Sequence, residues 1–374
     1  MYTQDELRDI ASKFVIYGDF LVAVPFGSGH INDTYQLTYD QGGVRLHYTM
    51  QRINHAVFHH PEQVMENMDR VTRHLLNKIH AERIETKKRT LRLLRTYTNQ
   101  PCVQDHRGNY WRAYVFVENA RSYDVLENPK QAYMAAQAFG DFQCNLVDLP
   151  GPRLHETIPN FHNTPKRVEA LEAAIKSDKA GRARQVRHEI DFIMKRREET
   201  EKLLKLNAEG SIPERITHND TKVNNILIDD LTGEGICVID LDTVMPGLAL
   251  YDFGDMVRAG TSAAEEDEVN LEKVGMRFEM YEALFRGFLS SAGGFLTPAE
   301  RENLPFAGKL ITLETAIRFL TDYLEGDVYF RTSRPGQNLD RARTQFKLVA
   351  DMEQHMGQMK QIVEELYRNC RAGQ

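Results

Sequence analysis

The polar stretch from Thr217 to Asn225 carries the residues best suited to chemistry. Asp220 is followed five residues later by Asn225, and Asp240 comes fifteen residues after Asn225, with Asp242 two residues further on. A carboxylate, an amide oxygen and a second carboxylate, in this order, are the groups with which kinase-like enzymes hold an acceptor hydroxyl and magnesium. The spacing therefore predicts phosphoryl transfer.

A predicted hairpin brings these side chains together. Residues 226–229, of which the first three are apolar, and the apolar residues 236–239 are predicted strands, and the turn between them contains glycine. Asn225 precedes the first strand and Asp240 follows the second, so an antiparallel pair places both at one end. Amide and carboxylate oxygens suit Mg²⁺, which keeps phosphate and water as its other ligands. We predict Asn225 and Asp240 as metal ligands and Asp220 as the group that accepts or orients the proton of the acceptor.

Two neighbouring residues are interpreted differently. Asp242 lies two residues after Asp240, so in an extended segment it points to the same side. It is either a further ligand, to a second metal or to the acceptor, or a structural residue. We interpret His218 as structural, holding the loop through hydrogen bonds.

Composition bounds the class of protein. The chain has 374 residues, 41% of them hydrophobic, and a net charge of −7, which argues against a general nucleic-acid binder. The four cysteines lack metal-ligand spacing and are expected to be reduced thiols. The acidic start is unlike a signal peptide, and no apolar run is long enough to span a membrane. We expect a cytoplasmic monomer with no membrane or nucleic-acid partner.

The hydrophobic pattern predicts an α+β, bilobal fold. Alternation over 20–53 predicts a three-strand meander, and an apolar stripe over 61–79 predicts a helix. Further strands are expected near 91–96 and 111–118, and helices over 3–15, 129–147, 165–208 and 264–370, with a break at 293–298. We therefore expect a small, strand-rich nucleotide-binding lobe over 1–118. A larger, mainly helical catalytic and substrate-binding lobe should follow over 119–374.

The first hairpin of the strand-rich lobe contains a candidate phosphate-binding turn. It consists of Gly27, Ser28 and Gly29. Backbone N–H groups in such a turn can bind the phosphates of ATP. The alternative is an ordinary hairpin turn.

Other residues of this lobe are candidates for contacts with ATP. Arg52 ends the third strand, where a cation should reach the phosphates, and guanidinium binds phosphate in a bidentate manner. Glu62 or Glu66 on the next helix could pair with it. The backbone at Val117, where the lobes join, is the candidate site for adenine. The alternatives are a surface arginine and a plain core strand.

The acceptor is expected to be a small molecule. Only eleven residues separate Asp240 from Asp252, which leaves no room for a peptide-docking segment. The acidic run 264–268 could attract a polycationic aminoglycoside, or it could be a solvated helix start. A nucleotide-binding pseudokinase is a further alternative, which the intact polar residues disfavour.

The motifs HNDTKxNN, IDLDTVMPG and YDFGD resemble those of the aminoglycoside phosphotransferase superfamily, which includes choline kinases and has a protein-kinase-like fold. More narrowly, GSGHINDTY, QRIN and RFLTDYLEGDVYF are similar to segments of bacterial N-acetylhexosamine 1-kinases. Those enzymes use ATP and Mg²⁺ to phosphorylate the anomeric hydroxyl of GlcNAc or GalNAc. The resemblance implies that Asp220 is catalytic and touches the sugar, that Asn225 and Asp240 bind magnesium, and that Arg318 and Tyr329 contact the sugar.

The spacing around Arg318 leaves two interpretations. Arg318 and Asp322 are four residues apart on a predicted helix, which is the spacing of a surface ion pair. Alternatively, Arg318 donates hydrogen bonds to sugar hydroxyls or to an acetamido carbonyl.

Overall fold

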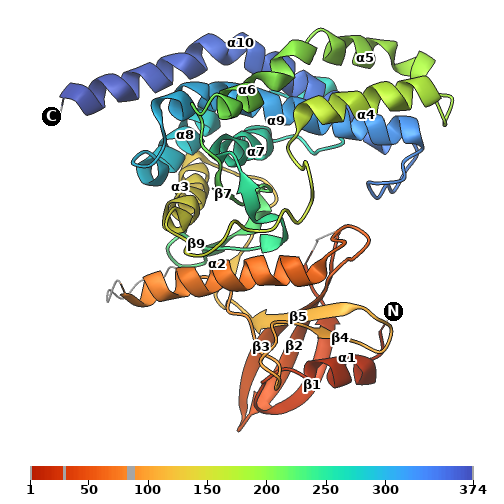
Figure 1. Ribbon diagram of the computed structural model, residues 1–374, viewed down its shortest axis with the longest axis vertical. Coiled ribbons are helices and arrows are strands. Elements are labelled where there is room, and N and C mark those ends of the chain that lie inside the picture. Colours follow the sequence, from red (N-terminus) through yellow and green to blue (C-terminus); the bar gives the residue numbers. More distant parts are fainter. Residues whose placement is uncertain (1, 28–30, 82–88, 373–374) are drawn as a thin grey trace.

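The computed structural model describes residues 2–27, 31–81 and 89–372. A sheet forms one end of the molecule and a larger helical part forms the other, with helix α2 (Pro61–Ala81) lying between them (Figure 1). This arrangement is the expected α+β fold with two lobes. Ser28 and Gly29 of the predicted phosphate-binding turn lie outside the described residues.

The sheet has the strand order β1-β2-β3-β5-β4. The predicted meander is confirmed as three antiparallel strands, and a segment from further along the chain completes the sheet. The strands are β1 (Asp19–Pro25), β2 (Asp33–Gln41), β3 (Val44–Arg52), β4 (Val103–Gln104) and β5 (Tyr110–Val115). The strand expected near 91–96 is reduced to isolated bridges at Leu93 and Thr96.

The two faces of this sheet have different partners. Helix α1 (Gln4–Ala11), which Thr3 and Glu6 cap at its N-terminus, covers one face. Met50 and Trp111 belong to the apolar core that the sheet shares with this helix. Because side chains alternate along a strand, the intervening residues of β3 and β5 project to the other face, toward the helical part.

Helix α2 packs on the helical part, although in sequence it lies between β3 and β4 of the sheet. Val64, Met68 and Val71, which belong to the predicted stripe, are buried in the same core as Phe139 and Phe142 of α3 (Pro129–Leu146). The hydrophobic effect thus packs α2 against the helical part, and the segments on either side of α2 connect it to the strands of the sheet.

The helical part is built around two apolar cores. The larger core includes α3, α7 (Ala249–Gly260), α8 (Phe278–Ala292) and the first half of α9 (Pro298–Glu325). The smaller core joins the second half of α9 to α4 (Thr164–Ser177), α5 (Arg187–Met194) and α10 (Gln337–Ala372). The predicted helical region 165–208 is therefore three helices, the third being α6 (Lys202–Ala208), with 3₁₀ turns between them. Residues 264–277 are mostly loop rather than helix.

Two small sheets lie where the lobes meet. One has the order β6-β8-β9, with strands Ala120–Arg121, Ile226–Asp229 and Gly235–Val238, and the other pairs β7 (Arg215–Thr217) with β10 (Met245–Gly247). The hairpin predicted over 226–239 is confirmed as β8 and β9. These sheets hold the polar stretch 217–225 and the segment that begins at Asp240.

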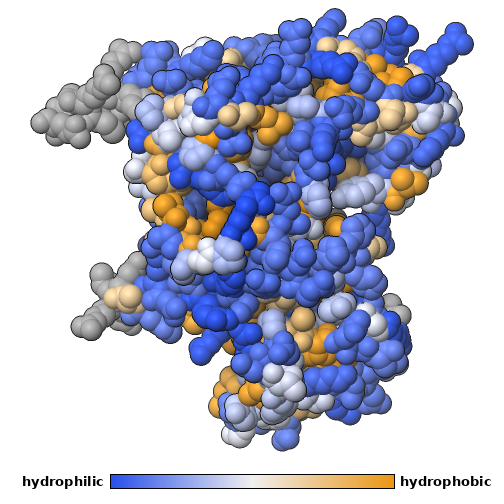
Figure 2. All heavy atoms as spheres, in the orientation of Figure 1, coloured by the Kyte–Doolittle hydropathy of each residue, from blue (hydrophilic) through white to orange (hydrophobic). Residues whose placement is uncertain are grey.

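Hydrophilic residues cover most of the face drawn in Figure 2, and apolar residues show there in scattered patches. Within the described residues, no helix combines the length and hydrophobicity that crossing a membrane requires.

Candidate active site

The loop that follows β7 is held by one buried carboxylate. Asp252, on α7, accepts hydrogen bonds from the backbone N–H groups of His218 (2.9 Å) and Asn219 (2.7 Å). Gln143 donates a further bond to it, and the Thr221 hydroxyl donates to its backbone carbonyl. Burial raises the pKa of Asp252, against the opposing effect of His218 and these donors. Sequence reasoning used Asp252 only as a landmark, but the YDFGD motif carried the signal.

His218 is structural, as predicted. Its Nε2 lies 2.9 Å from the carbonyl oxygen of Ile239, so it ties the loop to the end of β9. The rings of Phe139 and Phe142 pack edge-on against the imidazole. These contacts leave His218 buried and unsuited to act as a base on a substrate.

Asp220 lies beside a lysine and the predicted metal ligand Asn225. The ammonium group of Lys222 is 3.1 Å from its Oδ2. The amide nitrogen of Asn225 donates to the backbone carbonyl of Asp220 (2.7 Å) and to Oδ2 (3.1 Å). Burial opposes ionisation, but Lys222 and His218 outweigh it and lower the pKa of Asp220. The carboxylate is therefore ionised and held in one orientation.

Asp240 is the carboxylate without a partner. Its backbone is left-handed, with φ of 59°, a conformation that Asp and Asn tolerate better than most residues. The side chain is exposed, yet it makes no hydrogen bond or ion pair with any described residue. Desolvation by the surrounding protein, followed by the negative charges of Asp242 and Asp220, raises the pKa of Asp240 to about 6. A cation beside Asp240 would relieve this unfavourable charge.

The available oxygen atoms fit a magnesium ion. The amide nitrogen of Asn225 is bonded to Asp220, which leaves its Oδ1 free, as are both oxygens of Asp240. Within the described residues, no group of three His, Cys, Asp or Glu side chains could hold a metal alone. Two protein oxygens suit a hard ion that completes its shell with phosphate and water.

The carboxylate oxygens of Asp242 are occupied by bonds to other side chains of the protein. Both of its oxygens face the guanidinium of Arg112 on β5, one of them at 3.0 Å, and Asn32 donates to Oδ2 at 2.5 Å. The side chains of Arg112 and Asp242 are only 1% and 3% exposed. This pairing argues against a metal-ligand role, so of the two interpretations of Asp242 the structural one is favoured. Its buried ion pair joins the two lobes.

Arg52 does not pair as predicted. It bonds to Asp33, with Nε 2.7 Å from Oδ2, whereas Glu66 bonds to His155 at 2.9 Å. The prediction that Glu62 or Glu66 pairs with Arg52 is therefore wrong. The physical reason is strand alternation: Arg52 is opposite Trp111 in the register, and Gln51 is opposite Arg112. Arg112 is the strand arginine that faces the helical lobe, and sequence reasoning missed it.

Gly27 and Val117 occupy the edge of the sheet near the junction of the lobes. Gly27 has a φ of +81°, which favours glycine, and a side chain there would meet open space. The preceding residue, Phe26, packs on Phe116, next to Val117. Val117 lies just beyond β5, and neither its N–H nor its C=O bonds to another described residue. Its backbone is therefore available to a ligand.

Arg318 lies among aromatic rings. Its guanidinium carbon is 5.2 Å from the ring centre of Phe161, 5.5 Å from that of Phe330 and 6.0 Å from that of Tyr329. The alternative of an ion pair with Asp322 is wrong, because Asp322 instead accepts from the backbone N–H groups of residues 328, 329 and 330. No carboxylate in the described part of the chain is within ion-pairing distance of Arg318.

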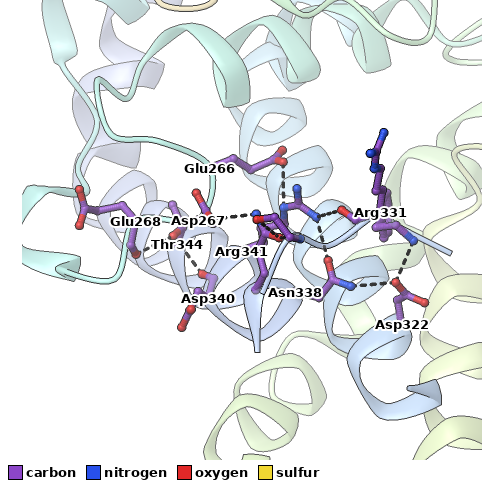
Figure 3. Close-up of polar contacts among 12 residues, drawn as sticks. Glu266, Asp267, Glu268, Asp322, Arg331, Asn338, Asp340, Arg341 and Thr344 are labelled. Atoms are coloured by element: carbon purple, nitrogen blue, oxygen red, sulfur yellow. Dashed lines mark hydrogen bonds and ion pairs between the residues drawn. The ribbon is translucent and has the colours of Figure 1, made fainter. Parts of the chain in front are cut away.

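Three of the four acidic residues in the run 264–268 pair with basic side chains of the protein. Figure 3 shows Glu266, Asp267 and Glu268 near residues of α10. Glu266 faces Arg341 at 3.5 Å and Arg258 at 3.6 Å, and Asp267 faces Arg334 at 3.2 Å. Glu268 pairs with Lys273. The run is thus neither a helix start nor a free anionic surface, and it offers little to a polycation.

Comparisons with known proteins agree with this geometry. The kinase-like arrangement recurs in an aminoglycoside phosphotransferase from Alicyclobacillus acidocaldarius, which is 15% identical with a TM-score of 0.59, over 96% of each chain. A spectinomycin phosphotransferase in complex with ADP and spectinomycin is 14% identical, with a TM-score of 0.54 over 96% of this chain and 99% of that one. An ethanolamine kinase from Plasmodium vivax is 14% identical, with a TM-score of 0.51 over 90% of this chain and 83% of that one. At these identities the likeness establishes the protein-kinase-like fold.

The fold and the loop after β7 define a phosphotransferase. The sequence profile of the phosphotransferase enzyme family matches residues 22–284, from β1 into α8. The chain belongs to that family.

Proposed function

We propose that this protein transfers the γ-phosphate of ATP to a hydroxyl group of a small, uncharged sugar, with an N-acetylhexosamine as the preferred acceptor. Asp220 would accept or orient the hydroxyl proton. Asn225 and Asp240 would hold magnesium, which when bound neutralises charge on the phosphates. The observation that carries the reaction type is the oriented, ionised Asp220 beside two free metal-ligating groups.

The charge of the acceptor side favours a neutral sugar over a polycation. Burial, followed by the nearby charge of Arg318, lowers the pKa of Arg167, so two guanidinium groups lie close together there. Arg167 also donates to the carbonyl of Phe161, whose ring lies under Arg318. An aminoglycoside or choline would be repelled at this point, whereas guanidinium donates well to hydroxyl and acetamido oxygens. Tyr329, which is 55% exposed, offers a ring face for a sugar.

The nucleotide would lie between residues 1–118 and 119–374, which we propose as its two binding lobes. The free backbone groups of Val117 would bind adenine. The turn that begins at Gly27 would cover the phosphates. The spectinomycin enzyme of the same fold was solved with ADP, which supports nucleotide binding by this fold.

A substrate screen tests the proposal. ATP and magnesium would be supplied with N-acetylhexosamines, unmodified hexoses, aminoglycosides and choline, and the products identified by ³¹P NMR. We expect an N-acetylhexosamine 1-phosphate as the main product. Asp220→Asn should lower kcat by about 10²–10⁴, the range for loss of a general base, with little change in the KM for ATP.

Arg318→Ala tests the acceptor assignment within the same assay. It should raise the KM for the sugar and leave the KM for ATP unchanged, because Arg318 lies on the acceptor side only. Equal effects on both constants would make Arg318 structural. Turnover of an aminoglycoside or choline in preference to every sugar would overturn the acceptor class.

A further inference from the structure

A buried histidine connects α9 to the loop that carries Asp220. His162 precedes α4, and its side chain is 7% exposed. Its Nδ1 lies 2.8 Å from Oε1 of Glu314 on α9, and its Nε2 lies 2.9 Å from the carbonyl oxygen of Asn219. The rings of Phe161 and Tyr251 pack on the imidazole at 4.7 and 4.9 Å. Neither His162 nor Glu314 has a part in the chemistry described above.

The contacts define the charge of this histidine. A carbonyl oxygen only accepts hydrogen bonds, so Nε2 of His162 must carry a proton. Glu314, which is 1% exposed, faces Nδ1 with one oxygen and accepts from the Thr164 hydroxyl with the other, at 2.6 Å. Both ring nitrogens therefore face acceptors, which is the environment of an imidazolium.

The charged groups around His162 support this assignment. Burial lowers the pKa of His162, but Glu314, with a smaller contribution from Asp255 on α7, outweighs it and raises that pKa. Burial likewise opposes ionisation of Glu314, but His162, the Thr164 hydroxyl and, from one turn along α9, Arg318 lower its pKa. The pair is thus ionised, and a buried pair of this kind is costly to break from one side.

The bond to Asn219 acts directly on the catalytic loop. Asn219 has a left-handed backbone, with φ of 65°, and its carbonyl belongs to the peptide bond that leads into Asp220. We propose that His162, kept protonated by Glu314, is a positioning residue that fixes this peptide and thereby the direction of the Asp220 carboxylate. The inference rests on the proposed role of Asp220 and adds a pH-dependent support to it.

The sign of the pH dependence follows from the raised pKa. The imidazolium is present below the ordinary value near 6.5 and is lost only as pH rises through the higher value of the folded state. Loss of the proton leaves Nδ1 and Glu314 as two acceptors facing each other, which loosens the loop. The turnover number should therefore fall at alkaline pH, while the KM for ATP should stay unchanged across the same pH range.

Three variants distinguish a role of His162 in positioning Asp220 from a role only in the stability of the fold. Glu314→Gln keeps the shape and removes the charge, His162→Gln removes the titrating ring, and Thr164→Val is the control that removes the other bond to Glu314. We expect Glu314→Gln to move the alkaline limb of kcat to lower pH and, at a pH just below the limb of the unmodified chain, to reduce kcat by about 10-fold. His162→Gln should lower kcat and abolish that limb, and Thr164→Val should keep it.

A titration that does not depend on activity completes the test. In protein labelled at histidine Cε1, the NMR signal of His162 should titrate above 6.5 in the unmodified chain and at lower pH in Glu314→Gln. A His162 signal that titrates at or below 6.5 in the unmodified chain, or the same kcat profile in all three variants, would overturn the inference. Full activity of Asp220→Asn would instead overturn the proposed function, whatever the titration shows.

Discussion

Three carboxylates of one site have three different surroundings. Asp220 faces Lys222 and Asp242 faces Arg112, whereas Asp240 makes no ion pair with a described residue and feels Lys222 and Arg112 only at longer range. The partner rather than the residue type sets the role of each: the first is held ionised, the second joins the lobes, and the third carries a raised pKa. Unrelieved charge at Asp240 suits it to a metal and costs the metal-free fold some stability.

Asp240→Asn should therefore separate stability from activity. Because the pKa of Asp240 is raised to about 6 in the folded state, its ionisation opposes folding; the penalty begins as pH rises above about 4, the ordinary pKa of Asp, and is complete above about 6. In EDTA at pH 7.5, the Asn variant should melt at a higher temperature than the unmodified protein, and the difference should shrink as pH falls from about 6 to about 4 and be absent below that. Thermal unfolding monitored by fluorescence measures this, and turnover with magnesium should be lost. A lower melting temperature throughout would contradict the argument.

Local spacing was enough to predict some of these residues and not others. Asp220, Asn225 and Asp240 are placed by one loop and one hairpin, so the sequence around them contains the geometry. Arg52 and Arg112 depend on which face of a strand each occupies, and a shift of one residue reverses the face. The ion pair between Arg112 and Asp242 joins residues that are 130 positions apart in the sequence, so no local pattern predicts it.

At the scale of elements, the short pairing of β7 with β10 places the loop that carries Asp220. Gly247 ends β10 opposite Arg215. A Cβ atom at Gly247 would clash with Oγ1 of Thr217 and would lie 2.8 Å from Oδ1 of Asn219. Both atoms belong to the start of the loop, so the absence of a side chain lets the two strands approach.

Gly247→Ala should consequently damage activity as well as stability. We expect a loss of about 1–3 kcal/mol in unfolding free energy, the usual cost of overpacking, with a lower kcat because Asn219 is displaced. The matched control is Gly357→Ala, at an exposed position in α10 where an added Cβ meets nothing within 4 Å. That change should stabilise by about 0.5–1 kcal/mol. Chemical denaturation of both variants checks the contrast.

Periodicity predicted the elements that bury one regular face. The meander, α2 and α3 all have such faces, and each appears within a few residues of its expected bounds. The segment 91–96 looked like a strand but only bridges its neighbours, and the run 264–268 looked like a helix start but is a loop held by arginines. In both segments, contacts with distant residues override local preference.

At the scale of the whole molecule, the lobes share a buried polar contact. Arg112 extends from β5 to Asp242, and its guanidinium also bonds to Gln51 at 2.7 Å. Asn32 and the backbone of Asn54 extend the same network along the sheet. Buried ions are stable only when paired, so the network favours one relative position of the lobes.

Arg112→Met should show how much the lobes depend on this contact. Leaving Asp242 buried without its partner should cost about 3–5 kcal/mol in unfolding free energy. Arg112→Met combined with Asp242→Leu should recover part of that loss. The control is Arg121→Met, since Arg121 pairs with Asp230 at the surface, where solvent screens the ion pair and its loss should change stability little. Urea unfolding followed by circular dichroism measures the free energy of unfolding of each variant. Equal losses in Arg112→Met and Arg121→Met would contradict the argument.

The way in which Asp322 holds the segment after α9 bears on how acceptor preference can diverge among relatives. Its carboxylate binds the main-chain N–H groups of Val328, Tyr329 and Phe330, and Asn338 supports it from α10. Every residue except proline has such an N–H group. The side chains of this segment can therefore be exchanged by mutation while its anchorage persists, which leaves the proposed acceptor side open to evolutionary change without disturbing the loop that carries Asp220.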